Sequence, residues 1–155
     1  MSRHRDQLQV PAKELELFND SLEECLADPG FLSRFYDIFL AKSPQIREKF
    51  SATDFRHQTR ALKASLMLLV FAVQGLPEGR AHLERIAEIH GPGKLDIPDR
   101  HYDLWLESLL QAAAERHRSF SSEMRRAWVA VLTPGIEHMR AHRRKLSEPS
   151  SGAEE

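Results

Sequence analysis

The sequence predicts an all-α fold, and three features lead to that expectation. Apolar side chains recur at helical spacing along most of the chain, and six of the seven glycines fall between or beyond these stretches. No run of alternating β-branched residues suggests a strand. With 155 residues, of which 41% are apolar, the chain has the size and composition of one domain with one hydrophobic core.

Three helices are predicted in the first half of the chain. Residues 12–26 carry one apolar stripe and stop at a Pro-Gly turn. A second helix begins near Phe31 and must break near Pro44, because a proline inside a helix removes a hydrogen bond. The third begins after Asp54, which supplies an N-cap, and runs to about Gln74.

Three more helices are predicted in the second half. A short one over residues 80–90 has His90 at the end of its apolar stripe, and a Gly-Pro-Gly sequence terminates it. The last two span about residues 99–117 and 122–144, and we expect Pro134 to kink the final helix.

The two ends of the chain differ from the middle in composition. Residues 1–11 and 147–155 are polar and rich in small residues, so we expect both to be disordered and residues 12–146 to form the folded domain.

The charge balance and the cysteine content predict which classes of partner and which cellular compartment suit the protein. The 22 basic and 23 acidic side chains nearly balance, which gives no reason to expect nucleic acid or an anionic membrane as a partner. A single cysteine, Cys25, forms no internal disulfide and suits a reducing compartment. The start of the chain lacks a signal-peptide pattern, and the longest apolar run, residues 66–73, is too short for a membrane span. These features predict a cytoplasmic protein.

His90 is the first candidate for metal chemistry. An imidazole binds a haem iron through one nitrogen while the other nitrogen makes a supporting hydrogen bond. His90 lies on a buried stripe at the end of a short helix, beside a loop that turns the chain away. Its spacing alone leaves a second interpretation open, in which a histidine at a helix C-terminus interacts only with the helix dipole.

Two segments resemble a known family. Residues 35–50, FYDIFLAKSPQIREKF, are similar to bacterial single-domain haemoglobins and to the globin domain of flavohaemoglobins, in which the proline ends the second helix and the phenylalanine matching Phe50 packs on the haem. The segment from Gln58 to Leu62 resembles the family's distal-helix signature, and His90 follows at the family's separation. The resemblance covers about residues 12–142.

The resemblance implies a globin fold of about six to eight helices around one haem b. His90 would be the iron ligand, and the haem would also be lined by Phe50, Leu62 and Tyr102. Tyr36 and Gln58 would face the sixth coordination position and stabilise bound oxygen, nitric oxide or carbon monoxide. The implied function is reversible binding of such a diatomic gas.

The chain departs from the family's pattern on both sides of the expected haem. Flavohaemoglobin-type globins commonly place a glutamate on the last helix beside a tyrosine and the iron-binding histidine; Tyr102 matches the tyrosine, but Arg143 falls where the glutamate would be. The loop between Phe50 and Gln58 is shorter than in close relatives. A one-residue shift of the distal helix would bring His57, Thr59 or Lys63 toward the iron, where His57, Gln58 or Lys63 could close the sixth position.

Other functions and contacts remain open. The chain could be a nitric oxide dioxygenase or a weak peroxidase that works with a separate reductase, or a dimeric gas or redox sensor; both a monomer and a homodimer are consistent with the sequence. A sensor would need an exposed apolar patch, for which the candidates are Trp105, Leu109, Trp128 and Leu132.

Candidate partners of the haem propionates are Arg60, Lys63, Lys94, Arg100 and His101. The remaining histidines are expected at the surface: His4, His82, His117, His138 and His142.

Overall fold

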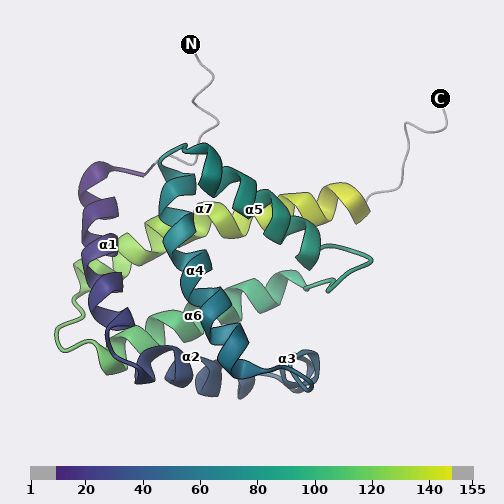
Figure 1. The fold of residues 1–155 in the computed structure, drawn as a ribbon, viewed down its shortest axis with the longest axis horizontal. Helices are drawn as coiled ribbons and strands as arrows, with labels where there is room; N and C mark the ends of the chain where they lie inside the picture. Colours follow the sequence, from purple (N-terminus) through teal and green to yellow (C-terminus); the bar gives the residue numbers. More distant parts are fainter. Residues whose placement is uncertain (1–9, 148–155) are drawn as a thin grey trace, which may run out of the picture.

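The computed structural model describes residues 10–147, and this part of the chain forms seven α-helices and no strand, as the sequence predicts (Figure 1). The helices are α1 (Ala12–Leu26), α2 (Gly30–Leu40), α3 (Pro44–Lys49), α4 (Phe55–Val73), α5 (Pro77–His90), α6 (Asp99–Arg116) and α7 (Ser122–Ser147). None of the helices in the described range is long and apolar enough to cross a membrane.

Two prolines begin helices that the sequence analysis missed or shortened. Pro44 does not merely end a helix: it is the first residue of α3, where the missing N–H costs nothing, and the Ser43 hydroxyl caps that helix by accepting a hydrogen bond from Gln45 N at 3.0 Å. Pro77 likewise begins α5, three residues before the predicted start at Arg80.

The seven helices pack mainly in pairs. Helix α1 packs on α7, α2 on α6, and α4 on α5, while α5 also contacts α7. Figure 1 shows α4 running steeply across the direction of α6 and α7. The pair α4 and α5 therefore brings the segment that contains Gln58 and the segment that ends at His90 into one part of the molecule.

The core is centred on Trp128 of α7, which is fully buried. Phe18, Phe31 and Phe120 contact its ring edge-to-face, with centroid distances of 5.2, 6.1 and 5.4 Å. The Trp128 indole N–H donates to the Ser21 hydroxyl at 2.8 Å, which satisfies the polar group that burial would otherwise leave without a partner. These contacts join α1, α2 and α7.

The four residues considered as an exposed patch on the last two helices belong to this core instead. Leu109, Trp128 and Leu132 have 0 to 1% of their surface exposed, and Trp105 is partly buried against the same cluster. The sequence left open whether these residues form an exposed patch or part of the core, and the structure places them in the core, because α1 and α2 cover α7 and α6 there.

Gly79 lies inside α5 rather than in a turn, which corrects the sequence interpretation. A Cβ atom at Gly79 would lie 2.1 Å from the Ala72 backbone nitrogen, a distance that no side chain can occupy. The first turn of α5 therefore approaches the last turn of α4 at backbone distance, and only glycine permits that approach. This contact sets the spacing between the two helices that carry Gln58 and His90.

The predicted disordered ends fall mostly outside the described residues, which exclude 1–9 and 148–155. Inside the described range, Val10 already packs against the core, and the Pro11 carbonyl accepts the first hydrogen bond of α1 from Leu15 N.

Candidate haem site

Tyr36 is the centre of the first half of the site. It lies on α2 and is 5% exposed, and the side chain of Gln58 on α4 lies close enough to act on its pKa. Phe50, at the end of α3, and Phe55, at the start of α4, contact the Tyr36 ring edge-to-face at centroid distances of 5.9 and 5.2 Å. A phenol and an amide thus lie together among aromatic rings.

The hydroxyl of Tyr36 keeps its proton. Burial raises the pKa of Tyr36 to about 12, and the side chain of Gln58 only partly opposes that shift. At neutral pH the side chain is therefore a neutral group that can donate a hydrogen bond.

The start of α4 determines which of its side chains reaches Tyr36. The Asp54 carboxylate caps the helix by accepting from Arg56 N at 3.1 Å, and Gln58 N makes its helical hydrogen bond to the Asp54 carbonyl at 2.9 Å. Leu62 lies one turn beyond Gln58 on the same face, and its side chain is part of the core. His57 and Lys63 are exposed, so this register brings Gln58 to Tyr36.

Phe55 is a site residue that the sequence analysis missed. It stacks on Phe50 with a centroid distance of 5.8 Å and closes one side of the Tyr36 ring. Its position three residues before Gln58, on the same helical face, was the available signal.

His90 forms the second half of the site. It is the last residue of α5, and its Nδ1 lies 2.8 Å from the Ile86 carbonyl oxygen. Because a carbonyl only accepts, Nδ1 must carry the hydrogen, and the lone pair of the neutral ring is then on Nε2. Burial lowers the pKa of His90, although the hydrogen bond to Ile86 acts in the opposite direction. The neutral imidazole, which is the form that binds a metal, is therefore favoured.

Tyr102 on α6 lies beside His90. The two rings are tilted at 39° with centroids 6.4 Å apart, and Tyr102 is buried. Burial raises the pKa of Tyr102 to about 12, whereas the nearby charge of Arg143 acts to lower it. Arg143 of α7 thus lies near Tyr102, and it is also bound to Asp96 in the loop after His90, with Nη2 3.0 Å from Oδ1.

Two comparisons with known proteins agree with this geometry. The family model for globins matches residues 33–139, which include Tyr36, Gln58, His90 and Tyr102. The chain belongs to the globin family. A crystal structure of a Pseudomonas aeruginosa PAO1 protein, described as structurally highly homologous to a human haemoglobin, is 38% identical to it. That match covers 84% of this chain and 98% of the other, with a TM-score of 0.80; no curated protein matches.

Globins bind haem in general, and the residues of this globin fit that group. His90 presents one nitrogen with a lone pair, fixed by the hydrogen bond of the other nitrogen. The group around Tyr36 combines the neutral donors Tyr36 and Gln58 with the rings of Phe50 and Phe55. An apolar surround with a few directed polar groups is typical of cofactor sites.

The candidate propionate partners do not form one group. Arg60, Lys63, Lys94 and Arg100 are exposed, whereas His101 is 3% exposed and its Nε2 has no hydrogen-bond partner. Burial and the charges of Arg100 and Lys49 lower the pKa of His101. Lys49 itself donates to the Leu95 carbonyl at 2.8 Å and so links α3 to the loop after α5.

Several histidines expected at the surface lie between helices instead. The side chain of His117 is 4% exposed, and its Nε2 lies 2.5 Å from a Glu24 carboxylate oxygen. His138 and His142 each have a buried Nε2 without a hydrogen-bond partner, and His82 is bonded to the Ser65 hydroxyl at 3.0 Å. The other such histidine, His4, lies outside the described residues.

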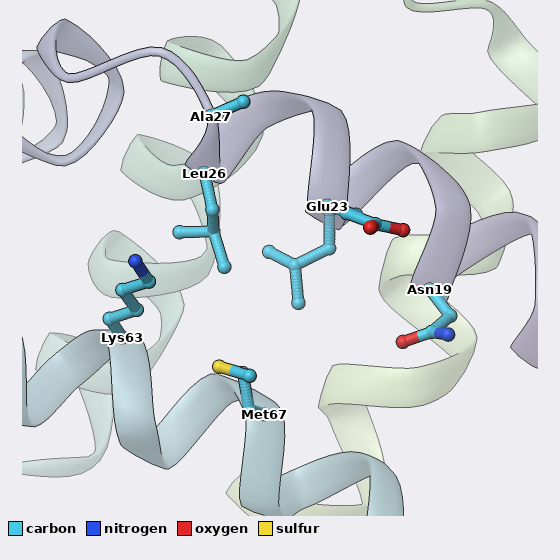
Figure 2. A pocket seen from close by; sticks show the side chains of 7 residues that line it. Asn19, Glu23, Leu26, Ala27, Lys63 and Met67 are labelled. Atoms are coloured by element: carbon cyan, nitrogen blue, oxygen red, sulfur yellow. The ribbon is translucent and has the colours of Figure 1, made fainter.

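A hollow of about 460 Å³ between α1 and α4 is separate from these residues. Figure 2 shows Lys63 and Met67 of α4 facing α1, where Asn19, Glu23 and Leu26 lie. Neither Tyr36 nor His90 lines it, so the hollow is not part of the candidate haem site.

Proposed function

We propose that this globin binds haem b through His90 Nε2 and reversibly binds oxygen or another diatomic gas. The hydrogen bond from His90 Nδ1 to the Ile86 carbonyl carries the proposal, because it makes Nε2 the acceptor atom of a half-buried, neutral ring. Haem would supply the iron that binds the gas. The chain fixes the angle and the protonation state of the imidazole.

Tyr36 and Gln58 would act on the gas from the opposite side. Both are neutral donors, and Gln58 lies close enough to Tyr36 to act on its pKa. A gas that gains partial negative charge would accept hydrogen bonds from them, each worth about 1 kcal/mol and up to about 3 kcal/mol with a charged acceptor. Phe50 and Phe55 pack around Tyr36 and exclude water, which strengthens these bonds.

Visible absorption spectra of the purified protein test the proposal. They would be recorded in the ferric state, after reduction, and after exposure of the reduced protein to carbon monoxide. We expect a Soret band that shifts when carbon monoxide binds. A protein that stays colourless after haem is added would show that the scaffold lacks the proposed chemistry.

The same spectra decide whether a side chain occupies the sixth position. Because His57 and Lys63 are exposed in this register, we expect His57→Ala and Lys63→Ala to leave the reduced spectrum unchanged. A reduced spectrum that changes in either variant would mean that the distal helix shifts and that the altered residue binds the iron.

A further inference from the structure

The loop that follows His90 is tied back to the helix that carries it. Ile97 N donates to the His90 carbonyl at 3.0 Å, and Leu95 N donates to the Ile89 carbonyl at 3.1 Å. Asp96 N donates to the Gly91 carbonyl at 2.9 Å. These bonds satisfy carbonyl groups at the end of α5 that have no partner within the helix. The position of the His90 backbone therefore depends on the conformation of residues 91–98.

Asp96 is the least relaxed residue of this loop. Its φ is 50°, and it is the only non-glycine residue of the described chain with a positive φ. A left-handed conformation is unfavourable for most side chains, although aspartate tolerates it better than others. Contacts made by its side chain must therefore help to hold the loop in this shape.

Arg143 of α7 provides that contact. Its Nη2 and Nε lie 3.0 and 3.2 Å from the same Asp96 oxygen, and the Arg143 side chain is 28% exposed. The Asp96 side chain is 55% exposed, so this is a surface ion pair, and it draws its strength from two donors of one guanidinium meeting the same carboxylate oxygen. One turn earlier, Arg140 donates to the Asp99 carbonyl at 3.1 Å and is paired with Asp103. Helix α7 thus contacts the connection between α5 and α6 at Asp96 and the first turns of α6 at Asp99 and Asp103.

We propose that Arg143 is a positioning residue for His90, acting through Asp96, and that its charge, held against the loop that follows His90, also favours the reduced form of the haem. This inference rests on the proposed haem ligation. The contact of Arg143 with Asp96 stabilises the conformation of residues 91–98. The backbone hydrogen bonds of that loop in turn hold the His90 backbone, to which the imidazole is attached. A positive charge near the site disfavours the ferric state, which carries one more positive charge than the ferrous state.

Two substitutions separate the positioning of His90 from the effect of the Arg143 charge on the reduction potential. Arg143→Gln removes the positive charge and leaves Asp96 unpaired, whereas Asp96→Asn leaves Arg143 unpaired. Both break the same ion pair, so both should change the Fe–His stretching band in the resonance Raman spectrum of the ferrous protein in the same way. Their reduction potentials should shift in opposite directions, lower for Arg143→Gln and higher for Asp96→Asn.

Conservative and control variants separate this role from general stability. Arg143→Lys keeps the charge, so it should restore most of the potential while restoring less of the stretching band. Arg144→Gln is the matched control, because Arg144 is one residue away, 58% exposed, and 3.9 Å from Asp99. It should change neither readout. A stretching band of Arg143→Gln identical to that of Arg144→Gln would overturn the positioning role, and equal potentials of Arg143→Gln and Asp96→Asn would overturn the charge effect.

The contact between Arg143 and Asp96 can also be tested in the protein without haem. We expect the amide hydrogens of Leu95 and Ile97 to exchange about two- to fivefold faster in Arg143→Gln than in the wild type, because the loop loses an exposed ion pair that holds it closed. Unchanged exchange would overturn the role of this contact. If haem does not bind at all, the proposed ligation fails, and the exchange experiment still decides whether Arg143 holds the loop.

Discussion

The two sides of the candidate haem site are held in place by different physical means. Around Tyr36 the contacts are neutral: the side chain of Gln58 and ring contacts with Phe50 and Phe55, all from one continuous stretch of the chain. The His90 ring is held by the Ile86 carbonyl, but the loop that follows it is also held by an ion pair. Arg143 reaches the loop after His90 from a helix 47 residues further on.

This difference suggests a division of labour. An unpaired ionic side chain in an apolar site would carry a large desolvation cost. Neutral donors such as a phenol or an amide avoid that cost and can still donate hydrogen bonds to a bound gas that carries partial negative charge. The Arg143–Asp96 ion pair holds the loop after His90 without touching the His90 ring, and both of its side chains stay partly exposed to water. Substitutions on the Tyr36 side should therefore alter gas binding, and substitutions on the His90 side should alter haem binding and potential.

The largest effect is expected from His90→Gly. Removing the imidazole deletes the proposed iron ligand, so the purified variant should lose its Soret band. Added imidazole should restore the band, since the vacated space takes the free ring. His82→Gly is the control on the same helix, because His82 is bonded to Ser65 instead. A Soret band that survives in His90→Gly without imidazole would assign the iron ligand to another residue.

Gly79→Ala should have the next largest effect, because it acts on the spacing between the two sides. The added Cβ would lie 2.1 Å from the Ala72 backbone, so α5 must move away from α4. Overpacking of this kind costs about 1–3 kcal/mol, beyond the roughly 1 kcal/mol that alanine gains over glycine in a helix. We expect a lower free energy of unfolding in urea and weaker haem retention together.

Gly30→Ala is the matched control for that substitution. A Cβ at Gly30 would meet only the end of the Arg116 side chain, so its cost is limited to disturbing the surface pair of Arg116 with Asp28, whereas a backbone atom cannot move aside. A loss of stability in Gly30→Ala equal to that in Gly79→Ala would mean that the α4–α5 approach is not the cause.

The helices could be predicted well from the sequence because their signals are local. Amphipathic stripes, the Asp54 cap and the Pro-Gly turn after Leu26 place the predicted ends of most helices close to those of the structure. Gly79 was misplaced because its role depends on contact with another helix, which local patterns do not contain. The same reason explains why Trp128 and Leu132 were considered as a surface patch and lie in the core.

In the candidate site, too, local motifs were predictable and contacts between distant segments were not. Tyr36 and Gln58 could be paired because a sequence motif contains both, and the structure brings their side chains together. The contact of Arg143 with Asp96 depends on a loop conformation with a positive φ, for which the sequence of the loop gave no signal. Haem ligation by His90 and gas binding at Tyr36 stay predictions until the spectra are recorded.

Tyr36→Phe should have a smaller effect than the changes at His90 and Gly79, and it addresses the neutral side alone. The variant keeps the ring contacts with Phe50 and Phe55 and loses only the hydroxyl. Loss of about 1–3 kcal/mol of hydrogen bonding should speed oxygen dissociation by roughly 5- to 150-fold, measured by stopped flow. Gln58→Leu should act in the same direction. An unchanged dissociation rate in both variants would remove this pair from the gas site.

The smallest effect concerns His101, which lies where the two sides meet. It precedes Tyr102 in the first turn of α6, and Lys49 next to Phe50 is close enough to influence it. Burial, with the charges of Arg100 and Lys49, lowers the pKa of His101 below its ordinary value of 6.5. Between these two pKa values the unfolded chain binds more protons than the folded one, so stability falls as the pH is lowered below that ordinary value.

His101→Phe should therefore make the apo-protein less sensitive to acid. The free energy of unfolding, measured in urea between about pH 7 and pH 5, should fall less steeply in the variant than in the wild type. Part of the slope should persist, because burial also lowers the pKa values of His82 and His90. His57→Asn is the control, since His57 is exposed. Equal slopes in the wild type and His101→Phe would show that acid acts through the other histidines.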